Sequence, residues 1–220
     1  SPTSRTGGVG TNTWAAGSEF NADGSVAAPN DAEQGAWLQF TPESNRTYTL
    51  SADVDITSTD TDWISLGFAE NNTTGAAFYT IDNPGGYGTI LYAGARGGTN
   101  GQVFPGEGTS ATSGEDTFDP ADSGAIALQV VLNTTGATSA DWTLEFFVES
   151  SSISGPTTLS AVGGTGDLGN IAYVGFTNLN DVTGNLSNFT LTETVIPEPA
   201  SLVLLLLGSV AVLGRRRARR

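Results

Sequence analysis

The chain has 220 residues, which is enough for one sandwich-sized domain, and its 29 glycines and frequent Ser and Thr favour an all-β fold. It contains no Cys, His, Lys or Met, which excludes disulfides, thiolate metal sites, Ser-His triads, zinc hydrolases and lysine Schiff-base enzymes in their usual forms. The net charge of −15 argues against nucleic acid as a partner and leaves cations and neutral glycans open.

The first segment, residues 1–35, is polar and glycine-rich, and we expect one or two short strands anchored by Trp14, Phe20 and Val26. The chain starts at Ser1 without an initiator Met. We expect a piece to be missing before it, as a cleaved signal peptide or through truncation of a gene fragment.

Strict alternation of apolar and polar residues begins after "AWLQF" (36–40), in the segment "TYTLSADVDI" (47–56). Period two over ten residues predicts a strand with one face in the core and one in water. "WISLGFAE" (63–70) predicts a second such strand, and "AAFYTI" (76–81) and "GTILYAG" (88–94) predict weaker ones.

Residues 95–124 lose the alternation, and we expect a long surface loop pinned by Val103, Phe104 and Phe118. Alternation returns in "AIALQVVLNT" (125–134) and "WTLEFFVE" (142–149), which predict a hairpin. Three closing strands are predicted, at 157–160, 170–179 and 185–194.

About ten short strands with turn residues between them and no amphipathic helix predict an antiparallel β-sandwich. We therefore expect one domain over residues 1–194, with its core at about 20–193, and a separate C-terminal segment over 195–220.

The C-terminal segment combines a Pro-Glu-Pro step, an apolar run and five of the eight arginines. The step is Pro197, Glu198 and Pro199, and the final residues 215–220 contain Arg215, Arg216, Arg217, Arg219 and Arg220. The apolar residues between them include Ala200, Leu202, Val203, Leu204, Leu205, Leu206, Leu207, Val210, Val212 and Leu213.

In order, spacing and position this segment resembles the PEP-CTERM sorting signal of exported proteins from polysaccharide-producing Gram-negative bacteria. The resemblance implies that a membrane enzyme, exosortase, recognises the Pro-Glu-Pro motif, cleaves near it and releases or transfers the protein. It also implies an exported bacterial protein, held transiently in the inner membrane and then delivered to the cell surface or extracellular matrix.

The physics of the segment agrees with a temporary anchor. We expect a transmembrane helix over about 197–214. Its apolar part, Ala200 to Gly214, is short for a stable span, because 15 helical residues reach about 22 Å whereas the hydrocarbon core is ~30 Å thick. The terminal arginines favour a cytoplasmic C-terminus by the positive-inside rule, which places the acidic domain outside. A buried C-terminal helix is the alternative, and it fits poorly with the flanking arginines.

The body of the chain is similar to concanavalin-like (laminin-G-like) jelly rolls. The similarity lies in "TYTLSADVDI", "WISLGFAE", the 125–149 hairpin and "IAYVGFTNLNDVTGNLSNFTLTE" (171–193). It implies a concanavalin-like sandwich followed by a short hydrophobic helix, with a body that serves as a glycan-binding or structural module.

A secreted glycoside hydrolase or lyase on the same fold is the competing interpretation, since glycosidases use two carboxylates at a defined separation. Asp53 and Asp55 share a strand face, but Ser51 occupies the place of the first Glu in the Glu-x-Asp-x-Glu pattern of this fold's glycosidases. Glu145 and Glu149 share a face but stand too far apart to cooperate directly. We therefore predict a protein that is not an enzyme.

No resident cofactor is predicted, with calcium as an open alternative, because Asp, Asn and carbonyl oxygens suit that ion. The candidate ligands are Asp60 and Asp62, Glu70 with Asn71 and Asn72, and Asn178 with Asn180 and Asp181, and none has a recognised spacing. Solvated loop polarity is the alternative for all of them. Tyr87, Tyr92 and Trp63 are aromatic side chains that could stack on sugars or fill the core.

Overall fold

The computed structural model describes residues 15–16, 24–27, 34–57, 63–69, 89–96, 101–103, 116–118, 125–138, 141–158, 171–179 and 183–196. This part of the chain contains thirteen strands. They are β1 (Ala15–Ala16), β2 (Ser25–Ala27), β3 (Gln34–Gln39), β4 (Arg46–Ile56), β5 (Trp63–Ala69), β6 (Thr89–Arg96), β7 (Gly101–Val103), β8 (Asp116–Phe118), β9 (Ile126–Asn133), β10 (Thr143–Val148), β11 (Ser151–Thr158), β12 (Tyr173–Leu179) and β13 (Thr183–Val195).

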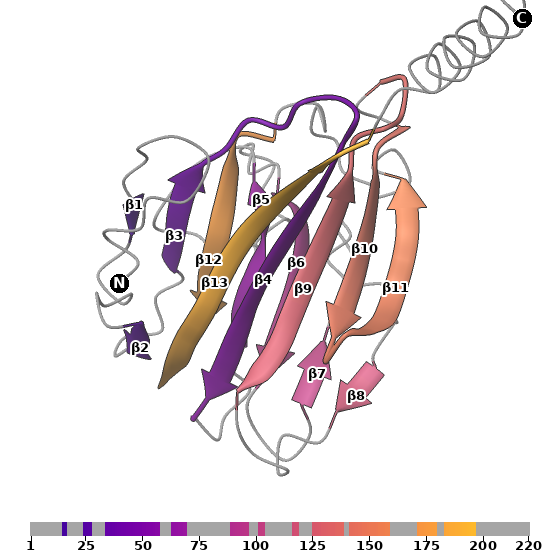
Figure 1. The fold of residues 1–220 in the computed structure, drawn as a ribbon. Coiled ribbons are helices and arrows are strands. Elements are labelled where there is room, and N and C mark those ends of the chain that lie inside the picture. The colour runs from indigo at the N-terminus through magenta and orange to yellow at the C-terminus, as the bar shows by residue number, and fades with distance from the viewer. Residues whose placement is uncertain are drawn as a thin grey trace, which may run out of the picture.

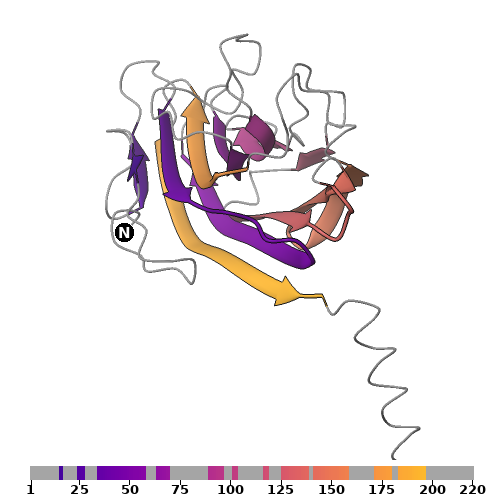
Figure 2. The same cartoon turned by 90° about the horizontal axis from the view of Figure 1, so that it is seen from above.

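Two antiparallel sheets form the body of the fold (Figure 1). One sheet has five strands in the order β1-β3-β12-β5-β6, and the other has six in the order β11-β10-β9-β4-β13-β2. Figure 2 shows the two sheets face to face when the molecule is seen from above. The predicted antiparallel β-sandwich is therefore confirmed, and the small sheet β7-β8 is an addition to it.

Alternation along the strands places the core between the sheets. In β4, Tyr48, Leu50, Ala52 and Val54 are each no more than 2% exposed, and the residues between them are only partly buried. The six-stranded sheet adds the inward residues of β9 and β10, and the five-stranded sheet adds those of β3, β5 and β12. The predicted hairpin is confirmed as β9 and β10, and Trp142, just before β10, lies in the core.

A β-bulge in β13 keeps the apolar side chains of that strand directed toward the core. Leu186 and Phe189 both pack against the core although they are three positions apart, which strict alternation cannot achieve. The pairing of β13 with β4 shifts register between Ser187 and Thr190, and Asn188 takes a left-handed φ of 52° there. The extra residue lets Phe189 turn inward against Phe176, with ring centroids 5.1 Å apart.

The structure corrects several boundaries. The predicted loop 95–124 contains β7 and β8, whose three residues each are too short to show a periodic pattern. The strand expected at 157–160 is β11, which begins at Ser151. Its first residues were not predicted, because this Ser-rich stretch lacks apolar alternation. The strand expected at 76–81 lies outside the described residues, as do the side chains of Trp63, Tyr92 and the predicted loop pins.

The outer face of the five-stranded sheet is closed at its centre. Trp37 points away from the core cluster, since its neighbours Ala36 and Leu38 point into it, yet Trp37 is only 4% exposed. Thr177, on the same face of β12, is 1% exposed. Gly35 leaves room for the indole, because a Cβ on Gly35 would lie 2.3 Å from Trp37 Nε1. This face therefore offers little open surface at β3 and β12.

Candidate functional site

The outer face of the six-stranded sheet is open and carries many hydroxyl and amide groups. Its outward residues on the four central strands β13, β4, β9 and β10 are partly buried or exposed, as expected for one wet face of a sandwich. We name this surface the hydroxyl face. It is made of Thr47, Thr49, Ser51, Asp53, Gln129, Val131, Asn133, Thr143, Glu145, Phe147, Ser187, Thr190, Thr192 and Thr194.

One row of the hydroxyl face runs straight across the sheet. Thr190 on β13 pairs with Ser51 on β4, and Ser51 pairs with Gln129 on β9. Gln129 in turn pairs with Phe147 on β10. Adjacent strands lie about 4.8 Å apart, so the row places two hydroxyls, one amide and one partly buried aromatic ring side by side.

Short polar contacts hold several of these side chains in place. The hydroxyls of Ser51 and Thr190 lie 2.7 Å apart, and Asn188 Nδ2 donates to Asp53 Oδ2 at 2.5 Å. At the other side of the face, Ser152 Oγ donates to Glu145 Oε1 at 2.8 Å. The face is thus a preordered array of hydrogen-bonding groups that contains no Arg or Lys.

The carboxylate pairs considered for catalysis are placed differently by the structure. Asp53 and Asp55 share the outer face of β4, as predicted, with Asp53 engaged by Asn188. Glu145 and Glu149 do not share a strand face, because β10 ends at Val148 and Glu149 adopts a left-handed φ of 49° in the following turn. Glu149 Oε1 accepts a hydrogen bond from the backbone N–H of Ala127 at 2.8 Å.

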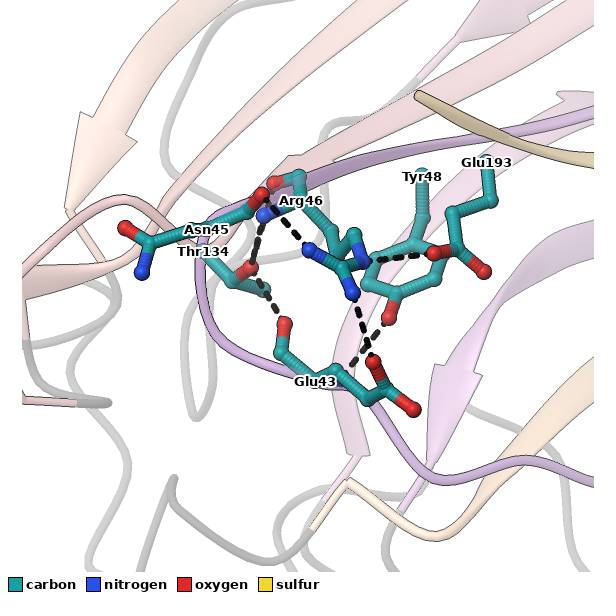
Figure 3. Close-up of polar contacts among 6 residues, drawn as sticks. All are labelled: Glu43, Asn45, Arg46, Tyr48, Thr134 and Glu193. Atoms are coloured by element: carbon teal, nitrogen blue, oxygen red, sulfur yellow. Dashed lines mark hydrogen bonds and ion pairs between the residues drawn. The ribbon is translucent and has the colours of Figure 1, made fainter. Parts of the chain in front are cut away.

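A second polar cluster lies at the end of the sandwich where β4 begins and β13 ends (Figure 3). Arg46 Nε donates to Glu193 Oε1 at 2.6 Å, and Arg46 Nη2 donates to Glu43 Oε2 at 2.9 Å. A third guanidinium nitrogen, Nη1, donates to the carbonyl of Asn45 at 3.3 Å. One side chain therefore joins the loop before β4 to the last strand, and we call this cluster the Arg46 clamp.

Buried groups anchor the Arg46 clamp to the core. Thr134 is fully buried, and its hydroxyl donates to the carbonyl of Glu43 at 2.6 Å and accepts from the Arg46 N–H at 3.0 Å. The Tyr48 hydroxyl accepts from the Glu43 N–H at 2.7 Å. Asn45 takes a φ of 59°, a conformation that Asn tolerates better than most residues. Its N–H donates to Thr134 O, and its carbonyl accepts from the Ile196 N–H, both at 3.0 Å.

Burial raises the pKa of Tyr48 above its usual value of 10, and the hydrogen bond from the Glu43 N–H opposes this in part. The carboxylates of Glu193 and Glu43 raise the pKa further, and the Arg46 guanidinium lowers it. The protonated phenol is therefore favoured in the folded state. Its contribution to stability is complete below pH 10 and is lost as the pH rises through the higher folded-state pKa.

We expect the free energy of unfolding to fall more steeply above pH 10 in the parent chain than in Tyr48→Phe, which has no ionisable hydroxyl there. Urea unfolding followed by tryptophan fluorescence between pH 8 and 11 measures this difference. Identical pH profiles for the two chains would contradict it, and Tyr173→Phe serves as the control for a tyrosine without a place in the Arg46 clamp.

The calcium candidates stay largely outside the described residues, which include neither Asp60, Asp62 nor Asp181, nor the 70–72 cluster. Asn178 is described, at 1% exposure near the end of β12, on the core side of the five-stranded sheet. Among the residues that the structure describes, no group of three or more acidic side chains is placed to hold a metal ion.

The sorting segment, residues 195–220, overlaps the described part of the chain only at Val195 and Ile196. Pro197, Glu198, Pro199, the predicted anchor and the terminal arginines all lie beyond it. Within the described residues there is no helix that is long and apolar enough to cross a membrane.

Two features of these surfaces, Phe147 and the Arg46 clamp, were not predicted from the sequence. Phe147 was not singled out from the sequence, although an aromatic residue that alternates with the core residues of its strand, next to Thr and Glu, is itself a signal. The Arg46 clamp could not be found, since Arg46 and Glu193 are 147 residues apart and no local pattern joins them.

Comparison with protein families identifies residues 195–220 as a PEP-CTERM protein-sorting motif. This confirms the motif predicted from the sequence. A search of the curated protein sequences finds no match to the chain.

Among solved structures, the chain is similar to the carbohydrate recognition domain of Emp46p in its metal-free form, at 12% identity and a TM-score of 0.50 over 81% of this chain and 87% of that one. The Emp47p carbohydrate recognition domain matches at 13% identity and a TM-score of 0.49, covering 83% and 89%. A mutant of alginate lyase Aly36B bound to alginate trisaccharide matches at 16% and 0.39, covering 79% and 81%. The similarity to the Emp46p domain confirms the predicted antiparallel jelly-roll fold.

Proposed function

We propose that the chain is an exported bacterial protein that is sorted through residues 195–220 and binds a neutral polysaccharide through its hydroxyl face. The sorting motif supports the first part. The observation that carries the second part is an open sheet face with ordered hydroxyls, amides and one aromatic ring, and with no cationic side chain.

The sorting part assigns a role to each section of the tail. Pro197, Glu198 and Pro199 form the feature that exosortase recognises, and the apolar run from Ala200 to Leu213 is a temporary anchor in the inner membrane. The arginines at 215–217, 219 and 220 keep the C-terminus in the cytoplasm. The sandwich then lies outside, and its destination after processing is the cell surface or the extracellular matrix.

The charge of the sandwich determines the class of glycan. All but one of the 23 acidic residues lie before Pro197, with only Arg5, Arg46 and Arg96 to balance them. Arg46 is occupied by two carboxylates in the Arg46 clamp. An acidic polysaccharide would be repelled, because like charges raise the free energy of association. A neutral chain of sugar hydroxyls instead finds matching donors and acceptors on the hydroxyl face.

A hydrolase or lyase remains the alternative function, and a reducing-sugar assay on the extracellular polysaccharide of the source bacterium distinguishes it from binding. Asp53 is the carboxylate on the open face with the best-defined contacts, and it is held by Asn188. Product formation that Asp53→Asn abolishes would favour the enzyme over the binding module.

The binding proposal predicts a specific loss in Phe147→Ala. A sugar ring packed on Phe147 would lose its stacking surface, so we expect the affinity for a neutral polysaccharide to fall roughly tenfold, as for a loss of about 1.4 kcal/mol. Glycan-array binding of the full chain identifies the ligand, and isothermal titration measures the change in affinity.

Tyr173→Ala is the matched control, because Tyr173 is a partly buried aromatic on the outer face of the other sheet. Equal losses in both variants would contradict the assignment of the hydroxyl face. Preferential binding of uronate chains over neutral ones would contradict the assignment of the ligand class.

A further inference from the structure

The folded domain ends directly against the sorting motif. The Ile196 N–H donates to the carbonyl of Asn45, and Pro197 is the next residue. The apolar run starts at Ala200, so only three residues separate Ile196 from that run. Fully extended, three residues span about 11 Å at most. The end of the sandwich must therefore lie close to any enzyme that binds Pro197–Pro199.

We propose that the Arg46 clamp restrains sorting: the enzyme that reads Pro197–Pro199 acts efficiently only when the end of β13 has detached from β4. This inference rests on the proposed sorting function and concerns the regulation of the same site. An enzyme that grips a peptide needs several extended residues on each side of the bond it cleaves, and the residues before Pro197 are paired in the six-stranded sheet.

Polar contacts, rather than buried apolar surface, hold this end of β13. Val195 is 59% exposed, so it adds little to the core. The attachment consists of the pairing of Glu193 to Val195 with β4, the Ile196 hydrogen bond and the bridge from Arg46 to Glu193. Such a strand end opens locally far more often than the whole domain unfolds. Loss of the Arg46 bridge raises the open fraction, and the apparent efficiency of processing follows that fraction.

The experiment follows conversion of the full chain to the processed form in cells that contain the sorting enzyme, by pulse-chase and immunoblotting. We expect Arg46→Ala and Glu193→Gln to be processed roughly three- to tenfold faster than the parent. Thr57→Ala is the matched control, since Thr57 follows β4 directly and its hydroxyl lies 3.0 Å from that of Thr183 on β13, at the other end of the two strands from the Arg46 clamp. We expect its processing rate to equal that of the parent.

A spacer gives a test that leaves the fold untouched. Inserting about eight Gly and Ser residues between Ile196 and Pro197 provides roughly 26 Å of free chain. We expect fast processing of this chain, with no further acceleration by Arg46→Ala. The unfolding temperatures of all variants are measured as well, so that a loss of stability of the whole domain is distinguished from detachment of β13.

Equal processing rates for the parent, the spacer chain and Arg46→Ala would overturn the inference, and so would equal acceleration in Thr57→Ala. Failure of the sorting function has a different signature, because a chain with the motif replaced would then be processed like the parent. If the chain with the replaced motif is not processed and Arg46→Ala is processed at the parental rate, only the proposed role of the Arg46 clamp is contradicted.

Discussion

Replacing Pro197, Glu198 and Pro199 together by alanine is expected to abolish processing and leave the full-length chain in the membrane fraction. The two prolines fix their own φ values near −65° and disfavour helix in the residue before each, so the motif differs from alanine in its backbone as well as in its side chains. Glu198 supplies a single negative charge beside the apolar run, where a charge stays with the head groups. Alanine removes both the backbone restriction and the charge, so the sorting enzyme loses the features by which we propose that it recognises the motif.

Membrane fractionation and intact-mass measurement of the recovered protein test this expectation. Val195→Ala is the matched control, because Val195 directly precedes the motif segment and is 59% exposed. Release of the triple variant at the parental rate would contradict the role of the motif. Recovery of parental protein from the cell surface with its tail intact through Arg220 would contradict sorting altogether.

Local patterns accounted for much of the fold. The alternation of Tyr48, Leu50, Ala52 and Val54 with polar residues can be recognised within one short segment, and the structure places these four side chains in the core. The hairpin of β9 and β10 was predicted for the same reason, since both strands alternate and a polar turn joins them. The sorting motif was also predictable, because a linear signal is read from adjacent residues.

Features that join distant segments could not be predicted in the same way. The pairing of β4 with β13 determines both the hydroxyl face and the Arg46 clamp, and it links Arg46 to Val195 across most of the chain. Alternation shows which residues face outward but does not show which strands are neighbours. The row of Thr190, Ser51, Gln129 and Phe147 therefore exists only once the strand order is known.

The closure of the five-stranded sheet's outer face was equally hidden. Trp37 reads from the sequence as one apolar residue in a run, and its position outside the core follows only from the placement of Ala36 and Leu38. Its burial directs the search for a ligand surface to the other sheet. Trp63, Tyr87 and Tyr92 were the aromatic residues considered for stacking on sugars, and their side chains lie outside the described part of the structure. Within the described part, Phe147 is an aromatic side chain on the open face of the six-stranded sheet.

Leu50→Ala is expected to destabilise the fold more than any other change considered for the sandwich. Leu50 is fully buried at the centre of β4, opposite Leu191 on one side and Val130 on the other. Truncation to Ala removes buried methyl groups and leaves a cavity between two sheets that cannot close fully. The expected loss is about 2–5 kcal/mol in the free energy of unfolding, or roughly a 5–15 °C lower Tm.

The neighbouring residue separates the two faces of the same strand. Thr49 lies on the hydroxyl face, so Thr49→Ala is expected to change the free energy of unfolding by only about 0.5 kcal/mol. Urea unfolding of both variants tests the alternation that underlies both the core and the hydroxyl face. Similar stability losses in the two variants would contradict the inward position of Leu50. A normal Tm with weaker polysaccharide binding in Thr49→Ala, and a lower Tm with unchanged binding of the folded fraction in Leu50→Ala, would show that stability and recognition reside on opposite faces of β4.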